Sequence, residues 1–140
     1  GRTFHDPLFA TENGKAKFST VSIPDLKRKD GEFTLTSVRS EGQFNTIIYE
    51  EEDVFRGIDD RWVVMMSGDD MTSIGVQENG HVHIKNQTGQ MNEVKVKAFD
   101  IPKGNVATFF PEANVLIPNL VDDQSKTPGF KSVAVRITKS

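Results

Sequence analysis

The chain has 140 residues, which is enough for one domain with a hydrophobic core and too few for two domains of ordinary size. Its formal net charge of −3 provides no basic field that would attract nucleic acid, so an anionic ligand must be held by a local cluster of donors. It contains no cysteine, which excludes disulfides, a cysteine nucleophile and thiolate-bound iron–sulfur or zinc sites within the chain.

Short apolar segments and polar turns alternate in the first half of the chain. Residues 1–14 are predicted to be an irregular lead-in that ends at the turn signal Asn13-Gly14. A loop over 39–46 has almost no helix or strand propensity, and the short apolar run 47–49 follows it. Three further apolar segments are predicted to be strands, over residues 17–23, 33–38 and 61–66.

One convincing helix is predicted after the last of these strands. Ser67 is suited to the N-cap position, because its hydroxyl can accept a hydrogen bond from the first turn. Asp69 and Asp70 follow in that turn, where carboxylates interact favourably with the helix dipole. Gly75 is the natural end of the helix, since glycine adopts the left-handed conformation of a C-terminal cap.

The second half of the chain is predicted to be strands joined by tight turns. Turn signals occur at Asn79-Gly80, at 87–89 and at 102–104. The strands between and after them are predicted over residues 81–86, 94–99, 106–110 and 132–137. About seven short strands with one helix predict a mainly β protein, either a barrel or a sandwich.

The remaining polar clusters do not form a recognisable catalytic or metal site. His81 and His83 share one face of a predicted strand, where two histidines could bind a metal, but a solvated face explains them better. The acidic groups at 50–53, 59–60 and 122–123 lack the ligand spacing of a calcium loop. No nucleophile elbow or phosphate-binding glycine loop is present in the sequence. We therefore expect no catalytic residue and no metal ligand in this chain.

The loop over 39–46 has a composition suited to an anionic, heteroaromatic ligand. Arg39 offers a planar fork of donors for a phosphate or a purine edge. Gln43 and Asn45 each offer a donor and an acceptor, as the rim of a pterin or guanine requires. The same residues are equally compatible with an ordinary surface turn in which Gly42 supplies an unusual backbone angle.

Two later segments, 111–116 and 126–131, also lie next to predicted strands. In this order, the three segments resemble the C-terminal cofactor-binding domain of formate dehydrogenase-like molybdopterin oxidoreductases, and the resemblance runs from about Gly14 to Arg136. It implies a double-psi β-barrel (aspartate decarboxylase-like) with one or two short helices. It also implies that residues 1–140 are a single molybdopterin dinucleotide-binding domain, the C-terminal part of a larger enzyme.

The resemblance assigns cofactor contacts to residues of all three segments. The cofactor it implies is molybdopterin guanine dinucleotide in the bis form, with molybdenum or tungsten held by preceding domains that are the partners of this one. An iron–sulfur cluster in the full-length enzyme is compatible with it, but not within this chain. Phe130 stands where some relatives have tyrosine, so it has no hydroxyl to offer. The assigned residues are Arg39, Ser40, Gly42, Gln43, Asn45, Thr46, Asn114, Phe130 and Lys131.

The function expected from the resemblance is cofactor binding in a cytoplasmic oxidoreductase. No apolar run approaches the ~20 residues that span a bilayer, so we expect neither a membrane nor a nucleic-acid partner. Two alternatives remain open at this stage. One is a stand-alone small subunit that docks on a separate catalytic chain, and the other is an interaction module that uses the barrel without a cofactor.

Overall fold

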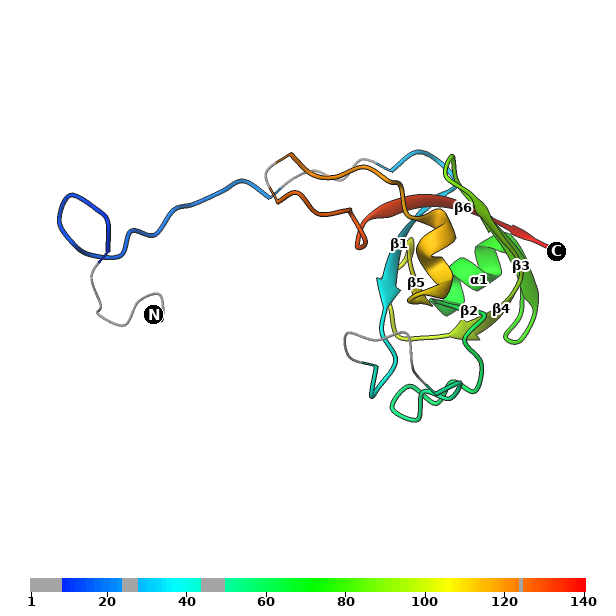
Figure 1. The fold of residues 1–140 in the computed structure, drawn as a ribbon. Helices are drawn as coiled ribbons and strands as arrows, with labels where there is room; N and C mark the ends of the chain where they lie inside the picture. The colour runs from blue at the N-terminus through cyan, green and yellow to red at the C-terminus, as the bar shows by residue number, and fades with distance from the viewer. Residues whose placement is uncertain (1–8, 24–27, 44–49, 124) are drawn as a thin grey trace.

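The computed structural model describes residues 9–23, 28–43, 50–123 and 125–140, and six strands in this part of the chain close into a barrel (Figure 1). One α-helix, α1, spans Gly68–Ile74, and one 3-10 helix, η1, spans Glu112–Leu116. The prediction of a mainly β barrel with one or two short helices is therefore confirmed. The strands are β1 (Glu32–Val38), β2 (Val63–Met66), β3 (His81–Lys85), β4 (Gln90–Ala98), β5 (Asn105–Phe109) and β6 (Val133–Lys139).

The first three strands and the last three alternate around the barrel, in the order β1-β5-β2-β4-β3-β6. β1 runs parallel to β5 and β2 runs parallel to β4, whereas the other four neighbouring pairs are antiparallel. Exchanging β1, β2 and β3 with β4, β5 and β6 leaves every one of these pairings unchanged. This interleaved, internally symmetric order is the double-psi arrangement that the family resemblance implies.

The core lies inside the barrel and continues beneath one long connection. β1 alternates between buried and partly exposed positions, whereas all four residues of β2 are buried. Val64 and Met66 point into the main core, while Val63 and Met65 pack with Ile58 in a second cluster that also contains residues of β5. The end of the connection between β1 and β2 therefore covers the outer faces of β2 and β5 at Ile58, and apolar burial holds it there.

Helix α1 forms as the sequence predicts. The Ser67 hydroxyl accepts a hydrogen bond from the Asp70 backbone N–H at 3.2 Å, and Gly75 ends the helix at a φ of 70°. The buried Asp70 carboxylate also accepts from the Gly104 N–H at 2.7 Å. This bond fastens α1 to the turn between β4 and β5.

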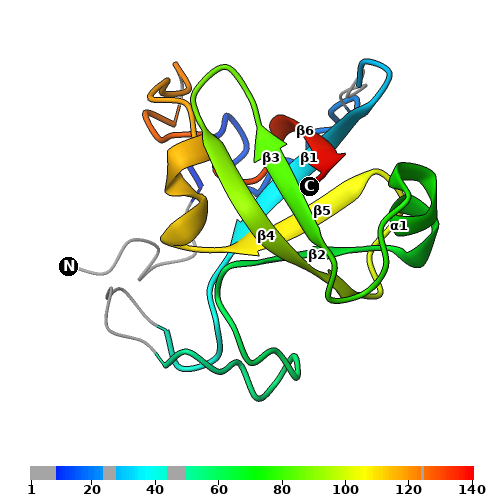
Figure 2. The ribbon, with the colours of Figure 1, turned by 90° about the vertical axis from the view of Figure 1, so that its right-hand side faces the viewer.

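The strand directions distribute the connections between two ends of the barrel, as Figure 2 shows. The first end collects α1, which follows β2, and the 99–104 turn, which follows β4. The second end collects η1, which follows β5, and the long 39–62 connection, which follows β1. Because β1 and β5 are parallel, both of these last segments must leave at the same end.

The strand predicted over 17–23 is wrong. These residues contain no strand, and Phe18, Val21 and Ile23 are exposed where the segment extends away from the barrel (Figure 1). A closed barrel pairs both edges of every strand, so it offers no edge to a seventh one.

No helix among the described residues is long and apolar enough to cross a membrane. The apolar run 47–49 lies outside the described residues.

Gly89 provides a test of how closely η1 packs against the β3–β4 turn. A Cβ at this position would lie 2.3 Å from the Val115 carbonyl oxygen, so Gly89→Ala must displace η1 or the β3–β4 turn. We expect a loss of about 1–3 kcal/mol in unfolding free energy, as for other overpacked sites, measured by urea denaturation. The control is Gly129→Ala, because a Cβ there would meet nothing within 4 Å. Equal midpoints for the two variants would contradict the close packing of η1.

Candidate functional site

Three segments that are distant in the sequence meet at the second end of the barrel. The Phe110 N–H donates to the Val38 carbonyl at 2.7 Å, where β5 and β1 end side by side. On the other side of β1, the Ser37 N–H donates to the Phe130 carbonyl at 3.1 Å. The Thr36 hydroxyl donates to the Lys131 carbonyl at 2.9 Å. The 39–43 loop, the segment that contains η1 and residues 130–131 therefore lie around one strand end.

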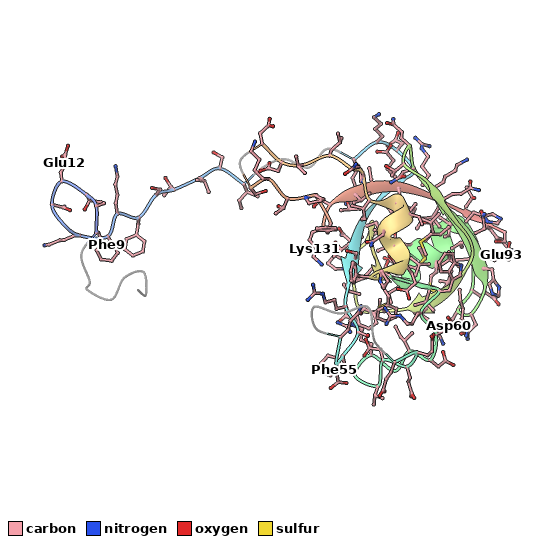
Figure 3. All side chains as sticks on the ribbon, in the orientation of Figure 1. Phe9, Glu12, Phe55, Asp60, Glu93 and Lys131 are labelled. Atoms are coloured by element: carbon pink, nitrogen blue, oxygen red, sulfur yellow. The ribbon has the colours of Figure 1, made fainter. Side chains whose placement is uncertain are left out.

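The exposed members of this group carry cationic and amide donors. Arg39 is exposed, with its Cζ 5.8 Å from the centroid of the Phe110 ring, close enough for a cation–π contact. The Lys131 ammonium donates to the Ser37 carbonyl, which keeps it beside β1 (Figure 3). Asn114 is exposed on η1. These residues can bind an anionic ligand that has hydrogen-bonding edges.

Gly42 gives the 39–43 loop its turn. Its φ is 75°, in the left-handed region where a side chain is unfavourable, and a Cβ there would meet nothing within 4 Å. The Gln43 N–H donates to the Ser40 carbonyl at 3.2 Å and closes the turn. The loop therefore exposes its backbone at Gly42 on the same side of the barrel as Arg39.

Ser40 and Gln43 face inward, unlike Arg39. Each is only 5% exposed. The Gln43 amide nitrogen donates to the Phe110 carbonyl at 3.0 Å, and its side-chain oxygen accepts from the Ser40 N–H at 3.3 Å. Both side chains thus connect the loop to the barrel in this structure, and a direct contact with a cofactor stays a prediction for them.

Arg61 is the centre of this inward-facing network. It is 3% exposed, and its guanidinium lies over the Phe109 ring, with Cζ 4.8 Å from the ring centroid. It donates from Nε and Nη2 to the two carboxylate oxygens of Glu112, at 2.7 and 3.1 Å. It also donates to the Ser40 hydroxyl at 2.9 Å, the Gln43 side-chain oxygen at 3.3 Å and the Phe110 carbonyl at 2.6 Å.

A hydrogen-bonded turn over 53–58 contacts the same loop. The Asp53 and Ile58 backbones form an isolated β-bridge, and the buried Asp53 carboxylate pairs with Arg56. Arg56 donates to the Arg39 carbonyl at 3.2 Å, so the turn and the loop are connected directly. The tip of the turn exposes Val54 and Phe55 to solvent (Figure 3).

Asp59, near the end of the connection between β1 and β2, forms ion pairs with two lysines on the outer face of β4. The Asp59 carboxylate lies 3.8 Å from the Lys95 ammonium and 3.7 Å from that of Lys97. A backbone hydrogen bond at Asp59, followed by these two cations, lowers the pKa of its carboxyl group. Because Asp59 is exposed to solvent, its pairs contribute little to stability.

Not every residue assigned from the sequence is placed by the structure. Asn45 and Thr46 lie outside the described residues.

The His83 Nε2 lies 3.6 Å from a Glu93 carboxylate oxygen, but no group of three potential metal ligands occurs in the described part of the chain. A groove of about 1230 Å³ lies between β6 and residues 118–122; Gly129 and Ser132 line it, but Arg39, Asn114 and Lys131 do not.

Sequence reasoning missed the network around Arg61. That residue was predicted only as the start of an apolar strand, and Glu112 only as part of a ligand-binding segment. An arginine directly before the apolar run 62–66 is a usable signal, because a charge in such a position needs a partner. The identity of that partner depends on the β1–β5 pairing, which the sequence pattern does not specify.

Comparisons with known proteins agree with the geometry. Residues 33–134 match a family model described as "Molydopterin dinucleotide binding domain". An uncharacterized oxidoreductase of Mycobacterium bovis is 31% identical over 140 residues, and the match covers 92% of this chain and 18% of the relative. The protein YdeP of Escherichia coli K12 is 30% identical over 142 residues, covering 93% of this chain and 19% of that protein.

A solved structure has the same fold. Acetylene hydratase from Pelobacter acetylenicus superposes with a TM-score of 0.60 at 12% identity, over 77% of this chain and 18% of that one. At this identity the likeness shows the fold alone. The chain thus spans about a fifth of the length of the curated relatives it matches.

The inward-facing role of Gln43 can be tested on stability alone. Gln43→Leu removes a buried amide and leaves the Phe110 carbonyl without this donor, so we expect a loss of about 1–3 kcal/mol in unfolding free energy. The control is Gln87→Leu, because Gln87 is exposed in the β3–β4 turn. Denaturant titration of both variants checks the difference. A Gln43 variant as stable as the parent would show that its side chain does not hold the loop.

Proposed function

Since the chain belongs to the molybdopterin dinucleotide binding domain family, we propose that it holds the dinucleotide part of molybdopterin guanine dinucleotide in a larger oxidoreductase. The single observation that carries this proposal is that the 39–43 loop, the segment with η1 and residues 130–131 lie at the same end of the barrel, where they expose Arg39, Asn114 and Lys131. A dinucleotide presents a diphosphate and a guanine edge. A guanidinium, an ammonium and an amide are the donors that suit these groups.

Each exposed residue has a distinct part in the proposed site. Arg39 and Lys131 would donate to the diphosphate, because both are cationic and lie on the same strand end. Asn114 would pair with a polar edge of the guanine or pterin. The backbone at Gly42 can approach a phosphate closely, since no side chain intervenes. Phe130 would supply an apolar contact, and Asn45 and Thr46 are proposed as cofactor contacts from the sequence alone.

The domain binds and orients the cofactor, while the cofactor supplies the redox chemistry. We propose that the bis form is bound, that molybdenum or tungsten is held by preceding domains, and that any iron–sulfur cluster belongs to those domains too. The preceding domains are the proposed partners, and neither nucleic acid nor a membrane is one. A cytoplasmic, formate dehydrogenase-like enzyme is the specific form we propose.

The two alternatives differ from this proposal in measurable ways. A stand-alone small subunit would be encoded with its own start codon next to a separate catalytic gene, whereas continuous coding sequence before Gly1 supports a domain of one enzyme. An interaction module without a cofactor would tolerate loss of Arg39, Asn114 and Lys131 together. The exposed donors at one strand end favour the cofactor-binding reading over this last alternative.

Lys131 provides the test of cofactor binding. In the natural-length protein, Lys131→Ala removes a charge-assisted donor, so cofactor retention should weaken about ten- to a hundredfold. Lys103→Ala is the matched control, because Lys103 is an exposed lysine in the turn at the opposite end. The measurements are molybdenum and tungsten content and the rate of cofactor loss, with melting temperature alongside. Equal retention in both variants would show that Lys131 is a solvated charge.

The 140-residue chain alone should not turn over formate with a dye acceptor. The sequence has no cysteine, and the described residues include no metal-binding cluster, so the chain supplies no redox centre of its own. The assay uses purified chain from which metals and cofactors have been removed by dialysis against chelator. Reproducible turnover that follows the protein through a second purification would overturn the assignment of all redox chemistry to the cofactor.

A further inference from the structure

The Arg61–Glu112 pair is not itself a site for an anion. The guanidinium is 3% exposed and already shares two hydrogen bonds with the Glu112 carboxylate, so the pair carries no net charge. Burial of such a pair is costly unless its remaining donors are satisfied. Here they are satisfied by Ser40, Gln43 and the Phe110 carbonyl.

The partners of Arg61 belong to the segments that expose the ligand-binding donors. Ser40 and Gln43 lie in the loop that exposes Arg39 and Gly42. Glu112 lies in η1, two residues before the exposed Asn114. Arg61 itself directly precedes Trp62 and β2, which is fixed in the core. One side chain therefore connects the loop and η1 to the rigid barrel.

This connection depends on the shape of a guanidinium. Its five donors lie in one plane, and they point in different directions toward the loop hydroxyl, the amide oxygen, the main-chain carbonyl and the carboxylate. Its face also stacks on Phe109. A lysine at this position has the same charge but a single ammonium, so it cannot reach all of these acceptors at once.

We propose that Arg61 is a positioning residue for the cofactor: it holds the 39–43 loop and η1 in one fixed arrangement before the cofactor binds. This inference rests on the proposed function. A loop that is already ordered loses less conformational entropy on binding, so the cofactor is retained more strongly. The effect of Arg61 on the cofactor is indirect, because its own donors face the protein.

The test compares Arg61→Lys and Glu112→Gln with a matched control, Asp70→Asn, in the natural-length protein. Asp70 is also 3% exposed and also bridges two segments, but it lies at the α1 end. Three quantities are measured for each variant: melting temperature, the rate of cofactor loss, and hydrogen exchange of the amides at 40–43 and 112–116. The two groups of amides report on the arrangement itself, with or without bound cofactor.

All three variants should lower the melting temperature, because each disturbs a buried polar network. Only Arg61→Lys and Glu112→Gln should speed exchange at 40–43 and 112–116, by about tenfold or more, as expected when a charged hydrogen-bond network is broken. The same two variants should lose the cofactor about ten- to a hundredfold faster than Asp70→Asn does. Glu112→Gln keeps the size of the side chain, so it remains informative if Arg61→Lys does not fold.

The outcomes separate this inference from the proposed function. If Asp70→Asn speeds cofactor loss as much as the other two variants do, Arg61 only stabilises the barrel and the positioning role is wrong. Unchanged exchange at 40–43 and 112–116 in both site variants also overturns it. If the parent protein contains no dinucleotide cofactor, the proposed function fails. The exchange measurement then decides alone whether Arg61 fixes the two segments.

Discussion

The parallel pairing of β1 with β5 is the constraint on which the candidate site depends. Parallel neighbours must send their following segments out at the same end, and here those segments are the 39–62 connection and η1. β6 runs antiparallel to β1, so the residues before it arrive at that end too. The strand pairing thus brings together three segments that are up to about ninety positions apart in the sequence.

The interleaved strand order makes the two ends of the barrel topologically equivalent, but the connections at the two ends differ in length. Its internal symmetry relates β1 to β4 and β2 to β5, so each end has one parallel pair that points toward it. At the α1 end the loop after β4 is only 99–104, whereas at the site end the loop after β1, the symmetry equivalent of β4, is 39–62. The longer connection provides enough chain for an exposed loop, the supporting 53–58 turn and the buried Arg61.

The sequence predicted most of the fold because local signals agree with it. The apolar segment 33–38, the Ser67 N-cap and the C-terminal Gly75 all specify elements that the structure contains. The prediction of a strand over 17–23 is wrong because the local sequence pattern does not show whether a partner strand is available. Apolar composition raises strand propensity, but a strand also needs a partner edge, and the closed barrel has none left.

Prediction of the site was limited in a similar way. The segments were recognisable, and the structure brings them to one end of the barrel with Arg39, Asn114 and Lys131 exposed. The inward orientation of Ser40 and Gln43 was not predictable, because it depends on Arg61, a residue outside the loop. Polar residues suited to a ligand are equally suited to a buried network, and only the fold distinguishes the two.

An experimental structure of the natural-length protein with its cofactor bound tests the proposed site directly. We expect dinucleotide oxygens within hydrogen-bonding distance of Arg39 and Lys131, with Asn114 beside a heteroaromatic edge. Arg61 should keep its bonds to Glu112 and the 39–43 loop. A dinucleotide bound at the α1 end, or in the groove between β6 and residues 118–122, would show that the proposed site is wrong.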